Sequence, residues 1–190
     1  MNVLGISGTP RINGNSEILL QYALKPFEES GWSIRHFKLS EITVAPCRAC
    51  EDICKGQGEC VIKDDMGMIY DAFGWCDAII VSSPTYSRNI CSQLMAVFDR
   101  SYAIGKLRLL EGKVGGAIAV GRGTGGGQNI SLNAIYTWFL SCGVVCVPGE
   151  LNGVTAVASD PGDILNQPNR LKQAEILGKN VLNVASKLRG

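Results

Sequence analysis

Four cysteines lie within 14 residues of the chain, at Cys47, Cys50, Cys54 and Cys60. Their spacing is C-x2-C-x3-C-x5-C, and four thiols in one short segment indicate a metal-binding site. Four cysteine ligands suit a [4Fe–4S] cluster or zinc. Structural zinc more often uses two C-x2-C pairs with a longer spacer, whereas one compact run can wrap a cubane. The segment therefore favours an iron–sulfur cluster. Zinc, free thiols or a lost cluster are the alternatives, and a disulfide is the weakest of them.

The other four cysteines lie beside or within apolar segments, which is typical of buried core thiols. They are Cys76, Cys91, Cys142 and Cys146. Cys91 differs from the rest because it opens a predicted helix, and a helix N-terminus can lower the pKa of a thiol. The chain has a single histidine, His36, on a predicted strand, so a Cys–His or Ser–His–Asp device is not expected.

A polar loop between residues 7 and 16 follows an apolar strand and precedes a helix. Helix N-termini offer unpaired N–H groups to anions. The loop adds three hydroxyls, an amide and one cation, and Gly14 can adopt a positive φ. It is neither a P-loop nor a Gly-x-Gly-x-x-Gly motif. An ordinary N-cap needs only one such residue, so we favour a phosphate site. Its residues are Ser7, Thr9, Arg11, Gly14, Asn15 and Ser16.

Two further loops follow apolar strands. In residues 83–89, Pro84 fixes φ and Tyr86 offers a flat apolar face to a planar heterocycle, an ordinary turn being the alternative. Residues 121–128 contain five glycines in eight positions, which lets the backbone approach a ligand closely. A flexible surface loop is the alternative there. Together, the three loops predict a flat cofactor that carries a phosphate, and FMN fits that description.

Alternating strands and helices must position these loops. The predicted strands are residues 2–7, 32–39, 77–83, 113–121 and 143–148, and the predicted helices are 16–29, 64–74, 90–102, 129–141 and 169–188. This alternation predicts a parallel sheet covered on both faces, with ligands beyond the carboxyl ends of the strands. Residues 40–63 form a Cys-rich insertion after the second strand. Residues 149–167 are expected to be a loop that can cover a neighbouring site.

Length and composition limit the class of protein. A chain of 190 residues predicts a single domain over residues 1–190. A net charge of +1 provides no general field for nucleic acid or anionic lipid. No apolar run approaches the ~20 residues of a membrane helix, and no signal-peptide pattern follows Met1. We therefore expect a cytoplasmic protein, where cysteines serve metal or redox chemistry rather than disulfides.

Several motifs resemble the NADPH-dependent FMN reductase family, which has a flavodoxin-like fold. They are Ser7-Gly8-Thr9-Pro10-Arg11 with Gly14-Asn15-Ser16, Ser83-Pro84-Thr85-Tyr86, and Asp99-Arg100. The resemblance extends to about residue 150. The four cysteines, and Cys60 leading into Asp64-Asp65-Met66, resemble the iron–sulfur flavoproteins within that family. Their usual pattern begins C-x2-C-x2-C, and here Glu51, Asp52 and Ile53 lengthen the middle gap to three residues.

The resemblance implies a three-layer α/β sandwich with a five-stranded parallel sheet in the order 2-1-3-4-5. It implies FMN phosphate contacts from Ser7, Thr9, Arg11, Asn15 and Ser16. It implies ring contacts from the other two loops, for which we select Pro84, Thr85, Tyr86, Ser87, Asn89, Gly121, Gly123 and Gly126. It also implies a homodimer or homotetramer with flavin sites near the subunit interfaces.

The function expected from the sequence is an FMN-dependent oxidoreductase that passes electrons between a [4Fe–4S] cluster and FMN. The cofactors would supply the reaction, so no catalytic side chain is predicted. The electron donor is NAD(P)H by resemblance, or a ferredoxin or other carrier. The first alternative is an NAD(P)H-dependent FMN or quinone reductase in which the cysteines are structural or bind zinc. The second is a redox-sensing or scaffold module.

Overall fold

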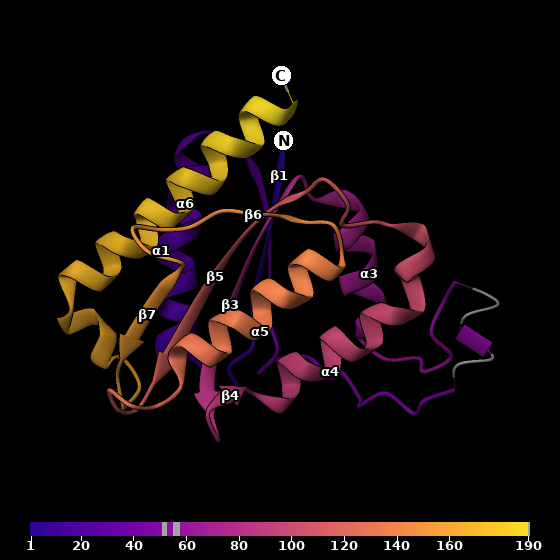
Figure 1. Cartoon of the computed structure of the whole chain (residues 1–190), viewed down its shortest axis with the longest axis horizontal. Helices are drawn as coiled ribbons and strands as arrows, with labels where there is room; N and C mark the ends of the chain where they lie inside the picture. The colour runs from indigo at the N-terminus through magenta and orange to yellow at the C-terminus, as the bar shows by residue number, and fades with distance from the viewer. Residues whose placement is uncertain (51–52, 55–57, 190) are drawn as a thin grey trace.

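A parallel β-sheet forms the centre of the computed structural model, which describes residues 1–50, 53–54 and 58–189 (Figure 1). Within these residues, five parallel strands lie in the order β2-β1-β3-β5-β6. Counted along the chain, this is the predicted order 2-1-3-4-5. The strands are β1 (Asn2–Ser7), β2 (Ser33–Lys38), β3 (Ala78–Tyr86), β5 (Val114–Gly121) and β6 (Val145–Cys146). The predicted fold class is therefore confirmed.

Helices cover both faces of the sheet and complete the three layers (Figure 1). One face carries α1 (Asn15–Glu29) and α6 (Pro168–Arg189). The other face carries α3 (Met66–Trp75), α4 (Ser92–Ser101) and α5 (Gln128–Ser141). Short 3-10 helices, η1 (Tyr102–Leu107) and η2 (Asp163–Asn166), follow α4 and precede α6. Among the described helices, none combines the length and the apolar composition needed to cross a lipid bilayer.

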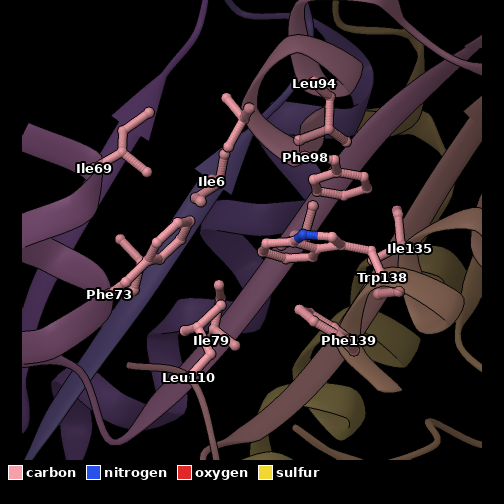
Figure 2. Packing of buried hydrophobic residues seen from close by; sticks show 14 of the residues in the cluster. Ile6, Ile69, Phe73, Ile79, Leu94, Phe98, Leu110, Ile135, Trp138 and Phe139 are labelled. Atoms are coloured by element: carbon pink, nitrogen blue, oxygen red, sulfur yellow. The ribbon is translucent and has the colours of Figure 1, made fainter. Parts of the chain in front are cut away.

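Two hydrophobic cores result from the alternation of side chains along the strands. Ile79 and Val81 of β3 point into the core beneath α3, α4 and α5, while Ile80 points into the core beneath α1 and α6. The first core centres on Trp138, whose ring stacks on Phe98 with 4.1 Å between centroids (Figure 2). This stacking packs α4 against α5.

The sheet has two short strands that the sequence pattern did not predict. The third strand runs to Tyr86 rather than ending at residue 83, and β4 (Asn89–Ile90) pairs back against it in a hairpin. Ser87 and Arg88 make this turn with φ of 48° and 67°. As a result, α4 begins at Ser92 and not at residue 90. The turn projects beyond the carboxyl end of the sheet.

The second unpredicted strand is β7 (Val154–Val157), inside the segment 149–167 that was expected to be a loop. β6 pairs with the start of β5, at Val114 and Gly115, and then leaves the sheet. β7 returns to the same edge and pairs with the end of β5, from Ile118 to Gly121. The two short strands therefore share one edge of β5 and together occupy the position that a single longer strand would take.

Candidate functional site

The three predicted loops meet in one cavity of about 420 Å³ beyond the carboxyl ends of β1, β3 and β5. This volume lies in the usual range for small-molecule sites. Among the described residues, the lining includes two arginines and no carboxylate side chain, which favours an anionic ligand. The lining residues are Thr9, Arg11, Gly14, Asn15, Ser16, Pro84, Thr85, Tyr86, Ser87, Val120, Gly121, Arg122, Ala158 and Ser159.

The first loop leaves the N-terminus of α1 open toward the cavity. The N-cap of this helix is Gly14, without a side-chain hydrogen bond, so the alternative of an ordinary Asn or Ser cap does not apply. A Cβ on Gly14 would lie 2.7 Å from Thr9 Oγ1, so only glycine fits this position. Ser16 Oγ is buried and has no hydrogen-bond partner among the described residues. A buried hydroxyl without a partner carries a desolvation penalty that an anion in the cavity would relieve.

Two predicted phosphate residues hold a neighbouring segment in place. We call residues 158–164 the strap. The Asn15 side chain donates to the Asp160 carbonyl at 2.8 Å and accepts from the Ile164 N–H at 3.2 Å. Arg11 donates from a terminal guanidinium nitrogen to the Ser159 carbonyl at 3.2 Å. The strap thereby closes one side of the cavity.

Ser7 lies beneath this loop and outside the cavity lining. Its hydroxyl is buried and, like that of Ser82 on the neighbouring strand, has no hydrogen-bond partner in the described part of the chain. The structure therefore brings five of the six predicted residues of the first loop to the cavity, whereas Ser7 does not line it.

The β3–β4 hairpin forms a second wall of the cavity. Thr85 Oγ1 lies 3.0 Å from Ser131 Oγ of α5, which fixes the hairpin to the helix layer. The Tyr86 ring is 40% exposed and offers a flat surface at the cavity mouth. The Asn89 side chain instead accepts the N–H of Ile90 at 2.8 Å, and Asn89 does not line the cavity.

The third loop reaches the cavity with its first two residues. Gly121 has no room for a side chain, because a Cβ would lie 2.7 Å from the Gln128 amide. That amide donates to the carbonyls of Gly123 and Ala156, at 2.9 and 3.3 Å, and so joins the glycine loop to β7. Gly123 and Gly126 lie outside the cavity lining, whereas Arg122 lies within it.

The strap is the part of the site that the sequence pattern did not identify. Ala158 and Ser159 line the cavity, yet they follow a strand of only four residues and belong to no recognisable loop motif. The contact from Arg11 to Ser159 spans 148 positions along the chain. No local signal in the sequence could have indicated it.

None of the four clustered cysteines lines this cavity. The described parts of the segment that carries them run at the outer edge of the molecule, beside α4 (Figure 1). None of these four cysteines forms a disulfide; Cys47 is exposed, Cys54 is buried, and Cys50 and Cys60 are half-buried. The Cys54 N–H donates to the Cys50 carbonyl at 3.3 Å. Among the described residues, no three metal-ligating side chains converge. The longer middle gap of the motif falls partly on residues 51–52, which lie outside the described residues.

Two other expectations concern Cys91 and His36. The prediction of a lowered pKa for Cys91 is wrong: burial raises the pKa of this thiol, and the hydrogen bonds around it do not offset the burial. Its sulfur donates to the Gly8 carbonyl at 2.8 Å and so supports the first loop from below. His36 is half-buried on β2, and burial lowers its pKa. It takes no part in the cavity, as expected.

The fold defines a flavodoxin-like α/β protein, and its cavity at the carboxyl edge of the sheet is lined by two arginines. A solved flavodoxin-type, WrbA-like protein of Agrobacterium tumefaciens superposes with a TM-score of 0.68 at 16% identity, over 98% of this chain and 97% of the other. At that identity the likeness shows the fold alone.

Sequence comparisons reach further than the fold. The family model for NADPH-dependent FMN reductases matches residues 1–157. An iron–sulfur flavoprotein of Methanocaldococcus jannaschii is 37% identical over 188 residues, which cover 97% of each chain. Another, from Methanosarcina thermophila, is 39% identical over 148 residues, 77% of each chain. The chain therefore belongs to the NADPH-dependent FMN reductase family, in its iron–sulfur flavoprotein branch, and is an FMN-dependent oxidoreductase.

Proposed function

We propose that the cavity binds FMN, with its phosphate at the first loop and its ring between the β3–β4 hairpin and Gly121. The observation that carries this proposal is the buried Ser16 hydroxyl without a partner, beside an uncapped helix N-terminus. Arg11 and Arg122 add positive charge to a lining without carboxylates among its described members. Phosphate is the anion that such a set of N–H, hydroxyl and guanidinium donors suits.

The chain's own groups bind and orient the cofactor in this proposal. FMN, when bound, supplies exchange between two-electron and one-electron chemistry. Thr9 and Ser16 would donate to the phosphate, and Asn15 would act through the strap that it holds. The Tyr86 face and the backbone at Gly121 would flank the ring. None of these roles requires a side chain to take or give a proton.

We further propose that Cys47, Cys50, Cys54 and Cys60 hold a [4Fe–4S] cluster that exchanges electrons with the flavin. Four cysteine side chains in one segment, none of them in a disulfide, are the donor set that such a cluster requires. The curated relatives named iron–sulfur flavoproteins support this proposal. NAD(P)H or a ferredoxin as electron donor, the homodimer or homotetramer, and the cytoplasmic location stay predictions from the sequence.

The proposal is tested by anaerobic purification followed by a visible spectrum and assays of iron, sulfide and zinc per FMN. About four iron and four sulfide per chain, as a cubane requires, would support the cluster. Cys50→Ser should lose iron and keep FMN, and Cys142→Ser, outside the motif, should keep both. Flavin with no iron would leave an NAD(P)H-dependent reductase. Protein without flavin would contradict the assignment of the cavity.

A further inference from the structure

A buried arginine lies between the helical core and the cysteine segment. Arg100 of α4 is the largest fully buried side chain among the described residues, and its side chain is 1% exposed. A buried charge must be paired and hydrogen-bonded to be tolerated. Arg100 donates to Asp64 at 2.5 Å, to the Ala45 carbonyl at 3.3 Å and to the Ile62 carbonyl at 3.1 Å. Its ion-pair partner is thus Asp64.

These three acceptors belong to the two flanks of the cysteine segment. Ala45 precedes Cys47 by two residues, and Ile62 follows Cys60 by two residues. One planar guanidinium therefore holds the entry and the exit of the segment at the same point. The fork of an arginine suits this task because its donors have a fixed geometry, which a lysine cannot reproduce.

The two aspartates after the segment strengthen the same junction. Asp64 accepts the N–H of Ala45 at 2.8 Å and that of Met66 at 3.1 Å. Asp65 accepts the N–H of Thr43 at 2.7 Å. The two carboxylates therefore tie the start of α3 to the flank that precedes the cysteines.

Arg100 lies next to one of the four clustered thiols. The Cys60 side chain interacts with the Arg100 guanidinium and with the hydroxyl of Tyr70. The Tyr70 hydroxyl donates to the Arg100 carbonyl at 2.8 Å, so the two residues form one unit. Arg100 Nε is buried and has no hydrogen-bond partner within the part of the chain that the structure describes. The positive guanidinium thus lies beside Cys60, and one of its donors, Nε, has no partner among the described residues.

We propose that Arg100 is the positioning residue of the iron–sulfur site: it closes the cysteine segment at both flanks and supplies a donor and a positive charge beside Cys60. This inference rests on the proposed cluster function. Hydrogen bonds and charge near the sulfurs set the reduction potential of such clusters. Arg100 therefore both holds the segment in a closed form and raises the potential of the cluster.

The test compares Arg100→Lys and Arg100→Gln with a control, Arg108→Gln. Arg108 directly follows η1, and its side chain is 69% exposed and pairs with Glu111. Iron per FMN should fall at least fivefold in Arg100→Lys, because lysine lacks the fork, and should not change in the control. FMN content and thermal unfolding show whether each variant is folded. The cluster that remains in Arg100→Gln should have a lower reduction potential. Its one-electron equilibrium should shift at least tenfold toward the oxidised form, which corresponds to about 59 mV.

A second variant separates charge from packing. Asp64→Asn removes the carboxylate that offsets Arg100, so the potential should shift upward, opposite to Arg100→Gln. A merely structural role would lower iron in both variants and move the potential in neither direction. If both Arg100 variants kept the wild-type iron content and reduction potential, the role of Arg100 would be overturned and the cluster proposal would stand. Wild-type protein that binds FMN but takes up no iron on anaerobic reconstitution would overturn the cluster proposal, and this inference with it.

Discussion

Replacing Ser16 with alanine should change the stability of the FMN-free protein and the affinity for FMN in opposite directions. The Ser16 hydroxyl is buried, lines the cavity and has no partner among the described residues. An unsatisfied buried polar group costs about 1–3 kcal/mol, so its removal should leave the FMN-free protein equally stable or more stable. A hydrogen bond to a charged group contributes about 1.5–3 kcal/mol. Its loss should weaken FMN binding roughly 10- to 140-fold, at about 1.4 kcal/mol per tenfold.

The assay is a titration of apoprotein with FMN, followed by quenching of flavin fluorescence, together with thermal unfolding of the apoprotein. Ser82→Ala is the matched control, because Ser82 also has a buried hydroxyl without a described partner but does not line the cavity. It should match Ser16→Ala in apoprotein stability and bind FMN like the wild type. Unchanged FMN affinity in Ser16→Ala, or an equal loss in both variants, would refute the phosphate assignment.

Three further predictions concern stability. Gly178→Ala should lower the free energy of unfolding by about 3 kcal/mol, the upper end for overpacking, because its Cβ would lie 2.0 Å from the Ala23 carbonyl oxygen; denaturant unfolding measures this. Lys38→Met should cost about 3 kcal/mol in the same assay, since it leaves the buried Glu17 carboxylate, 3.0 Å away, without its cation. Burial alone would raise the pKa of Asp64, but hydrogen bonds from a guanidinium and two backbone N–H groups lower it. Its contribution to stability should therefore be full above about pH 4 and be lost as the pH falls below that, and acid titration of Asp64→Asn should lack this component.

The strand order could be predicted because each parallel strand is an apolar run followed by a helix. Val81 and Ile118, for example, lie in segments buried on both faces, and such runs are typical of the interior of parallel sheets. The boundaries were less predictable where pairing decides them. β3 continues through Pro84, which pairs with Val120 of β5, to Tyr86, which pairs with Asn89 of β4. Proline is disfavoured in strand interiors, so the sequence pattern ended the strand before it.

The types of residue in the site were more predictable than their individual tasks. The sequence placed Asn15 and Ser16 together as phosphate donors, because both are polar and open a helix. In the structure, both polar atoms of the Asn15 side chain bind the strap, and only the Ser16 hydroxyl stays without a described partner. Two adjacent residues on one helix turn face different neighbours, and only the tertiary arrangement decides which neighbour each one meets.

The contacts of Arg100 also depend on the tertiary arrangement and not on a local sequence pattern. Asp64 and Arg100 are 36 positions apart, and nothing in the spacing of the cysteines requires either of them. Thiols in a compact run specify which metal chemistry the segment can support, since ligand type is a local property. Closure of that run is a separate requirement, because flexible flanks would oppose it with conformational entropy. Arg100 meets that requirement, because its side chain is 1% exposed and its guanidinium donates to both flanks. The ligands and the residue that closes the segment are therefore encoded in different parts of the chain.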